Sequence, residues 1–195
     1  HCLRARHFTL VTLQPRLAHE LARASNSPAY RLTQPLDKMS DQKFENAAVE
    51  GHLTATFSGA TAEERKAGAE ALASIVKEEG VRAFTVYKMN EKMAEGIQHK
   101  KDPVQVEGAL ELLLATAGTG QQAEPHILSA LPLVFECFGH KGAAVRELAQ
   151  KTVDAALEMM SPYAVGFVLP LLFKVLDESR KWQAKEAALK FIGNL

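Results

Sequence analysis

Apolar residues recur at helical spacing from Met39 to the end of the chain, and this pattern predicts about eight helices. Each predicted helix carries one apolar stripe, and a short polar segment separates it from the next helix. The predicted segments cover residues 41–57, 62–79, 82–99, 103–117, 125–138, 142–160, 162–176 and 180–195. No alternating apolar and polar run, and no Asn-Gly turn, indicates a strand. We therefore predict an all-α protein built from antiparallel pairs of helices.

Three of the predicted helices begin with a capping residue followed by a residue suited to the first turn. The three starts are Thr61 with Glu64 as a capping box, Asp102 before Pro103, and Ser161 before Pro162. Gly80 and the turn 118–120 are placed to end helices. Two prolines, Pro132 and Pro170, fall inside predicted helices, where we expect them to produce kinks.

Two predicted helices have buried faces that the pattern specifies in detail. In the segment 62–79 the expected core residues are Ala67, Ala71, Leu72, Ile75 and Val76. In the segment 82–99, taken as one continuous helix, the expected core residues are Phe84, Tyr87, Met89, Met93 and Ile97. Each helix is thus expected to pack through a single stripe.

The C-terminal part of the chain contains an internal repeat. Residues 124–160 are echoed by residues 161–195 at a shift of 38, which places Leu131-Pro132-Leu133 on Leu169-Pro170-Leu171 and Phe135 on Phe173. A period near 40 with two helices per unit is typical of HEAT and armadillo repeats. We predict a HEAT-repeat, armadillo-like α-α superhelix with units of roughly 41–80, 81–120, 124–160 and 161–195. Solenoids of this kind usually serve as binding surfaces.

Residues 1–38 differ in composition from the rest of the chain. They hold six Lys or Arg against two acidic residues, whereas the remainder holds 17 basic and 21 acidic residues and the whole chain has no net charge. Two interpretations are open: an organelle transit peptide, or translated upstream sequence with Met39 as the initiator. The scarcity of serine favours the second. In either case we expect residues 1–38 to be disordered and 39–195 to form part of a longer solenoid.

Composition and motifs argue against a catalytic or membrane protein. Cys2 and Cys137 show no disulfide or metal spacing, which is typical of a reducing, cytoplasmic setting. The apolar stretch 165–172 is too short to span a membrane. The sequence contains no phosphate-binding glycine loop, zinc-protease motif or nucleophile elbow. The group of His126, Cys137 and His140 is a remote enzymatic option, and we predict neither a catalytic nor a metal site.

Basic residues gather at the predicted turns between paired helices. Because successive turns line one edge of a solenoid, these residues could form a stripe that touches RNA through its phosphates. The single tryptophan adds an anchor residue common at partner surfaces. The candidate contact residues are Lys100, Lys101, His140, Lys141, Arg146, Arg180, Lys181, Trp182 and Lys185. The alternative is that the charges form a solvated face and that Trp182 packs between successive repeats.

Several of these elements together resemble a known family. The elements are Glu124-Pro125-His126-Ile127, Leu131-Pro132, Ser161-Pro162, Leu169-Pro170 and Lys181-Trp182-Gln183-Ala184-Lys185. They are similar to the N-terminal HEAT region of translation elongation factor 3, over roughly residues 81–195 and most strongly over 124–188. The resemblance implies a cytoplasmic, ribosome-binding segment whose partners are ribosomal RNA and ribosomal proteins.

The resemblance also implies where chemistry would lie in the complete protein. Members of the family carry two ATP-binding cassettes and use ATP and Mg²⁺ to promote translocation and the release of tRNA from the exit site. No cassette motif occurs in this sequence, so the resemblance implies no enzymatic activity and no cofactor for this fragment. The sequence also resembles the ribosome-bound HEAT scaffold that activates the amino-acid-starvation kinase, which likewise has a Trp after the first helix of a unit. The alternative function is therefore a protein–protein scaffold that binds partners through the solenoid surface.

Overall fold

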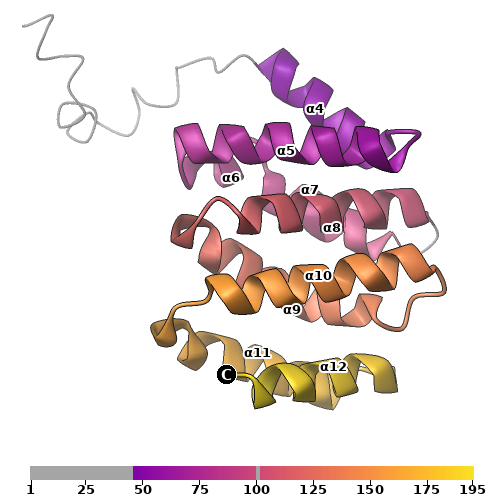
Figure 1. Ribbon diagram of the computed structural model, residues 1–195, viewed down its shortest axis with the longest axis vertical. Helices are drawn as coiled ribbons and strands as arrows, with labels where there is room; N and C mark the ends of the chain where they lie inside the picture. The colour runs from indigo at the N-terminus through magenta and orange to yellow at the C-terminus, as the bar shows by residue number, and fades with distance from the viewer. Residues whose placement is uncertain (1–45, 100–101) are drawn as a thin grey trace, which may run out of the picture. The chain divides into compact units, whose positions relative to one another are not determined.

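The computed structural model describes residues 46–99 and 102–195, and this part of the chain is helical (Figure 1). Its elements are α4 (Asn46–Ser58), α5 (Ala62–Glu79), α6 (Arg82–Val86), α7 (Met89–Gln98), α8 (Pro103–Ala117), η1 (Gln121–Ala123), α9 (Glu124–Cys137), α10 (Ala143–Met159), η2 (Pro162–Ala164), α11 (Val165–Glu178) and α12 (Trp182–Gly193). The prediction of an all-α protein is confirmed for these residues. The predictions for residues 1–38 and 41–45 lie outside them.

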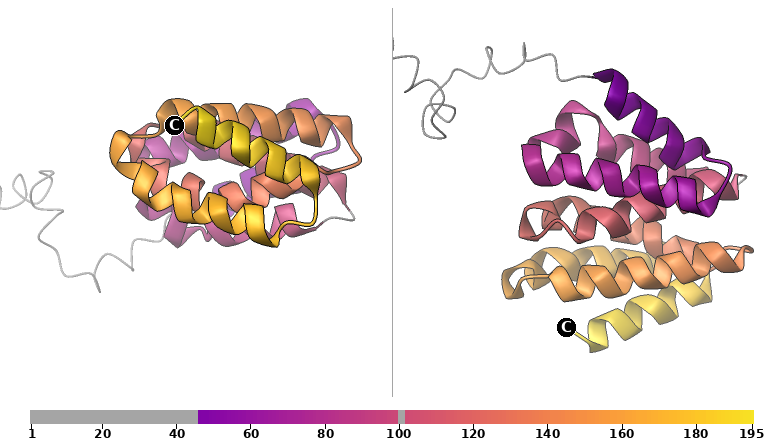
Figure 2. Two further views of the ribbon diagram at one scale, coloured as in Figure 1. Left: turned by 90° about the horizontal axis from the view of Figure 1, so that it is seen from below. Right: turned by 45° about the horizontal axis from the view of Figure 1, so that its top comes forward.

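The described helices form four hairpins that stack on one another. Within the hairpins α4 contacts α5, α7 contacts α8, α9 contacts α10, and α11 contacts α12. Between hairpins, α8 packs between α5 and α10, while α9 contacts α7, α11 and α12. Figure 2 shows the α11–α12 hairpin lying across the C-terminal end of the stack. The core therefore runs continuously between two layers of helices.

The capping signals in the sequence are confirmed at two helix starts. The hydroxyl of Thr61 accepts a hydrogen bond from the backbone N–H of Glu64 at 3.1 Å, before α5. The Asp102 carboxylate accepts one from the N–H of Val104 at 3.1 Å, before α8. Gly80 ends α5 with a φ of +74°, a conformation that favours glycine, and its N–H bonds to the carbonyl oxygen of Val76.

The third predicted start is wrong in its mechanism. The Ser161 side chain does not cap the following turn. Its hydroxyl instead donates to the Glu124 carboxylate at 3.2 Å, and its backbone N–H donates to the same carboxylate. Because Glu124 begins α9, this contact joins the starts of two successive hairpins.

The single helix predicted over 82–99 is wrong, because the chain breaks between α6 and α7. Lys88 adopts a left-handed φ of +51° at the break. In a continuous helix Tyr87 and Met89 would point about 160° apart, to nearly opposite sides, and could not share one face. The break allows both of them to be buried, together with Phe84. The predicted core residues are therefore correct although the element is not.

The predicted buried face of α5 is rotated from the observed one. Ala67 is exposed, whereas Arg65, Gly68, Ala69 and Ala73 are buried with Leu72 and Val76. The cause is the close approach of α4, whose Thr56 is fully buried. An ideal Cβ on Gly68 would lie 2.6 Å from Thr56 Oγ1, and one on Gly108 of α8 would lie 2.0 Å from Thr56 O. The backbone of α4 thus packs directly against glycines of α5 and α8.

The structural repeat has a different register from the sequence repeat. The helices α9 and α11 begin 41 residues apart, at Glu124 and Val165, while α10 and α12 begin 39 apart. The loop before α12 is shorter than the loop before α10, so no single shift fits both helices. Phe135 is fully buried, whereas Phe173, its partner at a shift of 38, is 56% exposed. The predicted unit boundaries remain predictions, as do the kinks at Pro132 and Pro170, which lie inside α9 and α11.

A helix that crosses a membrane must be both long and apolar. None of the described helices is by itself long and apolar enough to cross one. Taken together, residues 143–159 and 162–178 would satisfy a test of length and composition, but a 110° bend separates them.

Candidate functional site

Two turns of successive hairpins meet at one edge of the stack. The Lys181 side chain, just before α12, lies over Gly139, where an ideal Cβ would be 2.2 Å from Lys181 Cδ. Its ammonium donates to the carbonyl oxygen of Glu136 at 2.9 Å, in the last turn of α9. A cation at a helix C-terminus is favourable because the last carbonyls carry partial negative charge. Lys181 therefore joins the α9 turn to the α12 turn.

The turn after α9 is held by its own side chains. Arg146 Nη1 donates to the carbonyl oxygens of His140, at 2.7 Å, and Lys141, at 2.9 Å. The ring nitrogen Nδ1 of His140 accepts a hydrogen bond from the N–H of Gly142 at 3.1 Å. These bonds fix the turn and leave the Lys141 side chain exposed.

A third segment reaches the same edge. Ile97 and Gln98, at the end of α7, line a cavity of about 110 Å³ together with His140 and Lys181. Lys100 and Lys101 follow Gln98 in the chain but lie outside the described residues. We define the turn edge as Gln98, the turn 139–142 with Arg146 that supports it, and residues 179–185.

The turn edge presents cations and one aromatic ring to solvent. Lys141, Arg146 and Arg180 are exposed, and Lys185 is half-buried. Trp182 is 68% exposed, so its packing between hairpins does not hold for the described part of the chain. Neither Arg180 nor Lys185 forms an ion pair with any residue that the structure describes. Their charges are therefore available to an outside partner.

Several acidic side chains near the turn edge are paired along their own helices, whereas Asp177, three residues before Arg180, is exposed and forms no ion pair with a described residue. Glu147 binds Lys151 at 2.8 Å, and Glu186 binds Lys190 at 2.8 Å. The hydrogen bond and the charge of Lys151 lower the pKa of Glu147, and Glu147 in turn raises the pKa of Lys151. These pairs reduce the acidic charge that opposes the cations of the edge.

The three residues of the remote enzymatic option, His126, Cys137 and His140, contact different neighbours. His126 stacks on Phe84 with ring centroids 4.3 Å apart, and its Nδ1 lies 2.7 Å from Asn90 Nδ2. Burial lowers the pKa of His126. Cys137 is buried and its thiol donates to the carbonyl oxygen of Leu133 at 3.5 Å. Over residues 46–99 and 102–195, no three His, Cys, Asp or Glu side chains are arranged to hold a metal ion.

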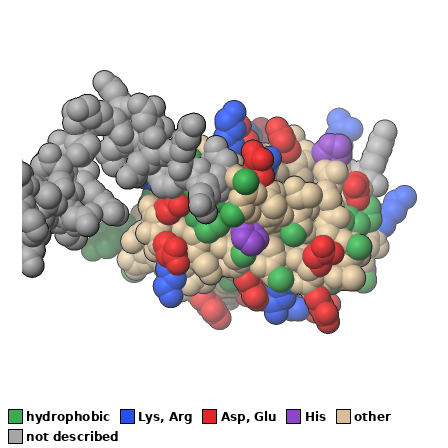
Figure 3. All heavy atoms as spheres, turned by 90° about the horizontal axis from the view of Figure 1, so that it is seen from above, with side chains coloured by type: hydrophobic (Ala, Val, Ile, Leu, Met, Phe, Trp, Pro, Cys, Tyr) green, Lys and Arg blue, Asp and Glu red, His purple; other side chains and the backbone are tan. Residues whose placement is uncertain are grey.

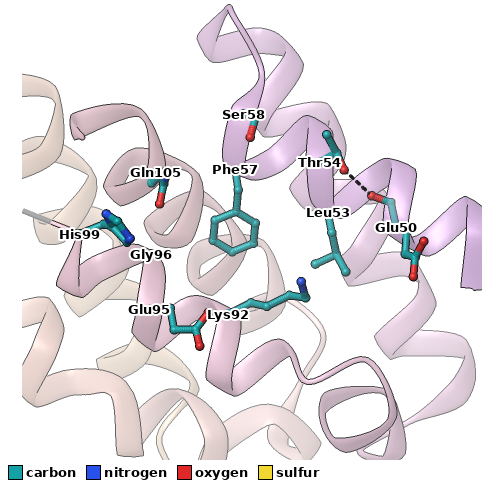
Figure 4. A pocket seen from close by; sticks show the side chains of 10 residues that line it. All are labelled: Glu50, Leu53, Thr54, Phe57, Ser58, Lys92, Glu95, Gly96, His99 and Gln105. Atoms are coloured by element: carbon teal, nitrogen blue, oxygen red, sulfur yellow. Dashed lines mark hydrogen bonds between the residues drawn. The ribbon is translucent and has the colours of Figure 1, made fainter. Parts of the chain in front are cut away.

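Sequence reasoning missed a groove of about 470 Å³ between α4 and α7. Leu53 and Phe57 of α4 face Lys92 and Glu95 of α7 across it (Figure 4). No local pattern could reveal this groove, because its walls are distant in sequence. Seen from the α4–α5 end, basic and acidic side chains are interspersed around the outline of the molecule (Figure 3). Neither sign of charge dominates the described surface that is visible at this end.

Stacked helical hairpins without β-structure, over the residues that are described, define an α-solenoid of the HEAT class. The sequence model of the family described as EF3 N-terminal HEAT repeat matches residues 65–195. The chain belongs to this family. The resemblance to the elongation factor 3 HEAT region is thereby confirmed.

Two kinds of relative share this region. Elongation factor 3 of Gonapodya prolifera is 31% identical over 151 residues, which cover 76% of this chain and 14% of that protein. Elongation factor 3 of Zygosaccharomyces rouxii is 31% identical over 157 residues, covering 80% of this chain and 15% of that protein. The stalled ribosome sensor GCN1 of Homo sapiens is 33% identical over 133 residues, which cover 67% of this chain and 5% of that protein.

The chain thus spans about one seventh of the length of its elongation factor 3 relatives and about one twentieth of GCN1. No solved structure shows a significant match to the chain.

Proposed function

We propose that this chain is a ribosome-binding N-terminal HEAT segment of an elongation factor 3-like protein, and that the turn edge makes the contact. The observation that carries the proposal is the joining of successive turns by Lys181, with exposed cations on both sides. Relatives named as an elongation factor and as a stalled ribosome sensor share this region and support the same partner.

The geometry gives each cation a distinct role in this proposal. Lys181 is bound to Glu136 and acts as an internal support that keeps two hairpins in fixed orientation. Arg146 supports the turn that carries Lys141. Lys141, Arg180 and Lys185 then contact phosphates of ribosomal RNA or acidic groups of ribosomal proteins. Phosphate contacts position a protein on RNA without reading its sequence.

In the complete protein we propose that ATP and Mg²⁺ bind in cassettes outside this sequence. Their hydrolysis would drive translocation and the release of tRNA from the exit site in the cytoplasm. The HEAT segment would contribute attachment to the ribosome and no catalysis.

Co-sedimentation of the 195-residue chain with purified ribosomes tests the contact. The double variant Arg180→Glu, Lys185→Glu should lose most of its binding at low salt, because neither cation forms an ion pair with a described residue and Arg180 is exposed. Binding of the unmodified chain should weaken steeply as salt rises, since cations that contact phosphates displace condensed counterions. The double variant should show a shallower dependence, by roughly one unit of log–log slope for each lost contact.

The matched control is Lys77→Glu, Lys92→Glu, which changes the net charge equally but affects exposed lysines of α5 and α7. The control should co-sediment like the unmodified chain. Equal loss in both double variants would show that overall charge, and not the turn edge, governs binding. Unchanged co-sedimentation of the turn-edge variant would contradict the proposed contact.

The second candidate function is a protein–protein scaffold without ATPase activity. GCN1-type relatives match at 33% identity, comparable to the elongation factors, and favour it. Sequencing the transcript downstream of Leu195 separates the two candidates. Two cassettes with phosphate-binding loops would support the elongation factor, and a long continuation of HEAT units would support the scaffold.

A further inference from the structure

Trp182 lies on the outward stripe of its helix and not on the face where hairpins stack. The equivalent helix α10 begins 39 residues earlier, and its ion pair Glu147–Lys151 corresponds to Glu186–Lys190 of α12. At this register Trp182 corresponds to Ala143, which is exposed although the α11–α12 hairpin stacks on α9. The indole ring is therefore placed to meet an outside partner.

Cations precede and follow Trp182 within a few residues. Arg180 precedes Trp182 by two residues and is exposed, and Lys185 follows it by one helical turn. The Lys181 ammonium is bound to Glu136, so its charge faces the protein and not the ring's outer surface. An exposed aromatic ring with an exposed and a half-buried cation within about one helical turn matches a stacked base with its neighbouring phosphates, since bases stack on aromatic side chains while cations contact the backbone.

We propose that an unpaired nucleotide of the ribosome's RNA stacks its base on Trp182, with its neighbouring phosphates on Arg180 and Lys185. This inference rests on the proposed function and adds a recognition mode to it. A protein partner is less well matched, because this stripe of α12 offers little apolar surface. Besides Trp182, its exposed large apolar side chain is Leu189, which is 59% exposed. Single-stranded RNA is commonly bound through bases splayed onto aromatic side chains.

The chain contains one tryptophan, so its fluorescence reports on this ring alone. The full chain is titrated with a short single-stranded RNA and with an abasic oligonucleotide that has the same number of phosphates. We expect the base-bearing RNA to quench Trp182 and to bind about tenfold more tightly than the abasic strand. Trp182→Ala, followed by filter binding, should remove that difference, and Trp182→Phe should restore much of it.

Leu189→Ala is the matched control, because it removes an exposed apolar side chain from the same stripe without removing a ring. It should leave the affinity for base-bearing RNA unchanged. Equal binding of base-bearing and abasic strands would overturn the stacking proposal. Loss of ribosome co-sedimentation in Trp182→Ala and Leu189→Ala alike, with RNA binding unchanged, would also overturn it and would indicate a protein partner.

These outcomes are separable from failure of the proposed function. If base-bearing and abasic strands bind equally but Arg180→Glu, Lys185→Glu still reduces ribosome binding, the proposed ribosome contact of the turn edge is supported and only the base-stacking proposal is contradicted. If neither the ribosome nor the base-bearing RNA binds the unmodified chain, both proposals fall.

Discussion

Arg65 and Glu107 form a nearly buried ion pair between α5 and α8, with side chains 7% and 18% exposed. Arg65 also donates to the carbonyl oxygen of Gly59 at 2.9 Å. Removing one member of such a pair leaves the other charge buried without compensation. Single residues on this interface therefore have large effects on stability.

Glu107→Leu should lower the free energy of unfolding by about 3 kcal/mol, because Arg65 is left unpaired. The double variant Arg65→Met, Glu107→Leu should recover most of that loss, since two apolar side chains need no partner. Urea denaturation measures all three chains. A double variant as unstable as the single one would mean that the side chains matter through packing alone.

His126 makes stability depend on pH. Burial lowers its pKa below the ordinary value of 6.5, so the unfolded chain takes up the proton at a higher pH than the folded chain. The stability present above about pH 6.5 is therefore lost as the pH falls toward the pKa of the folded state. His126→Gln should remove this part of the dependence, whereas His99→Gln, at an exposed position, should not.

Urea denaturation at several pH values between about 7.5 and 5.5 checks this expectation. The His126→Gln chain should lose less free energy of unfolding across that range than the unmodified chain. Identical losses in the two chains would show that carboxylates or other histidines account for the whole dependence.

At the scale of elements, α4 is secured by glycines on its neighbours. Gly108 of α8 meets the backbone of Thr56 and Phe57, which cannot move aside as a side chain could. The hydrophobic pattern of α4 is weak, so the sequence alone gives little reason for it to pack. Backbone contact through small residues supplies that reason.

Gly108→Ala should destabilise the chain by about 1–3 kcal/mol and detach α4, because the new Cβ would lie 2.0 Å from Thr56 O. Gly51→Ala is the matched control within α4, where a Cβ meets nothing within 4 Å. It should stabilise the helix by up to about 1 kcal/mol. Thermal unfolding compares the two, and equal effects would contradict the role given to the glycine contact.

The sequence predicted most elements because caps and helical periodicity are local signals. It failed where contacts between helices determine the structure. The break at Lys88 allows Tyr87 and Met89 to be buried together. The buried face of α5 is determined by the approach of α4. Periodicity treats glycine as neutral, so Gly68 and Gly108 could not be recognised as contact residues.

The candidate site was predictable to a similar extent. The repeat placed the basic residues at turns, and the structure brings the turns after α9 and before α12 together. The different role of Lys181 could not be predicted, since it depends on Gly139 and Glu136 of the preceding hairpin. The exposure of Trp182 likewise depends on which face of α12 packs inward.

At the scale of the molecule, the stack offers different surfaces to a partner. The turn edge carries cations from successive hairpins, whereas the α4–α7 groove mixes both signs of charge. A solenoid transmits little between distant repeats, because each hairpin contacts mainly its neighbours. Binding at the turns of the α9–α10 and α11–α12 hairpins should therefore leave Leu53 and Phe57, on the α4 wall of the groove, unchanged.

Hydroxyl-radical footprinting of the chain on purified ribosomes tests this account most directly, because it locates the buried surface residue by residue. We predict protection of residues 139–142 and 179–185, with Trp182 strongly shielded, and no change at Leu53 and Phe57 in the groove. Protection of the groove residues with an unprotected turn edge would contradict the central claim.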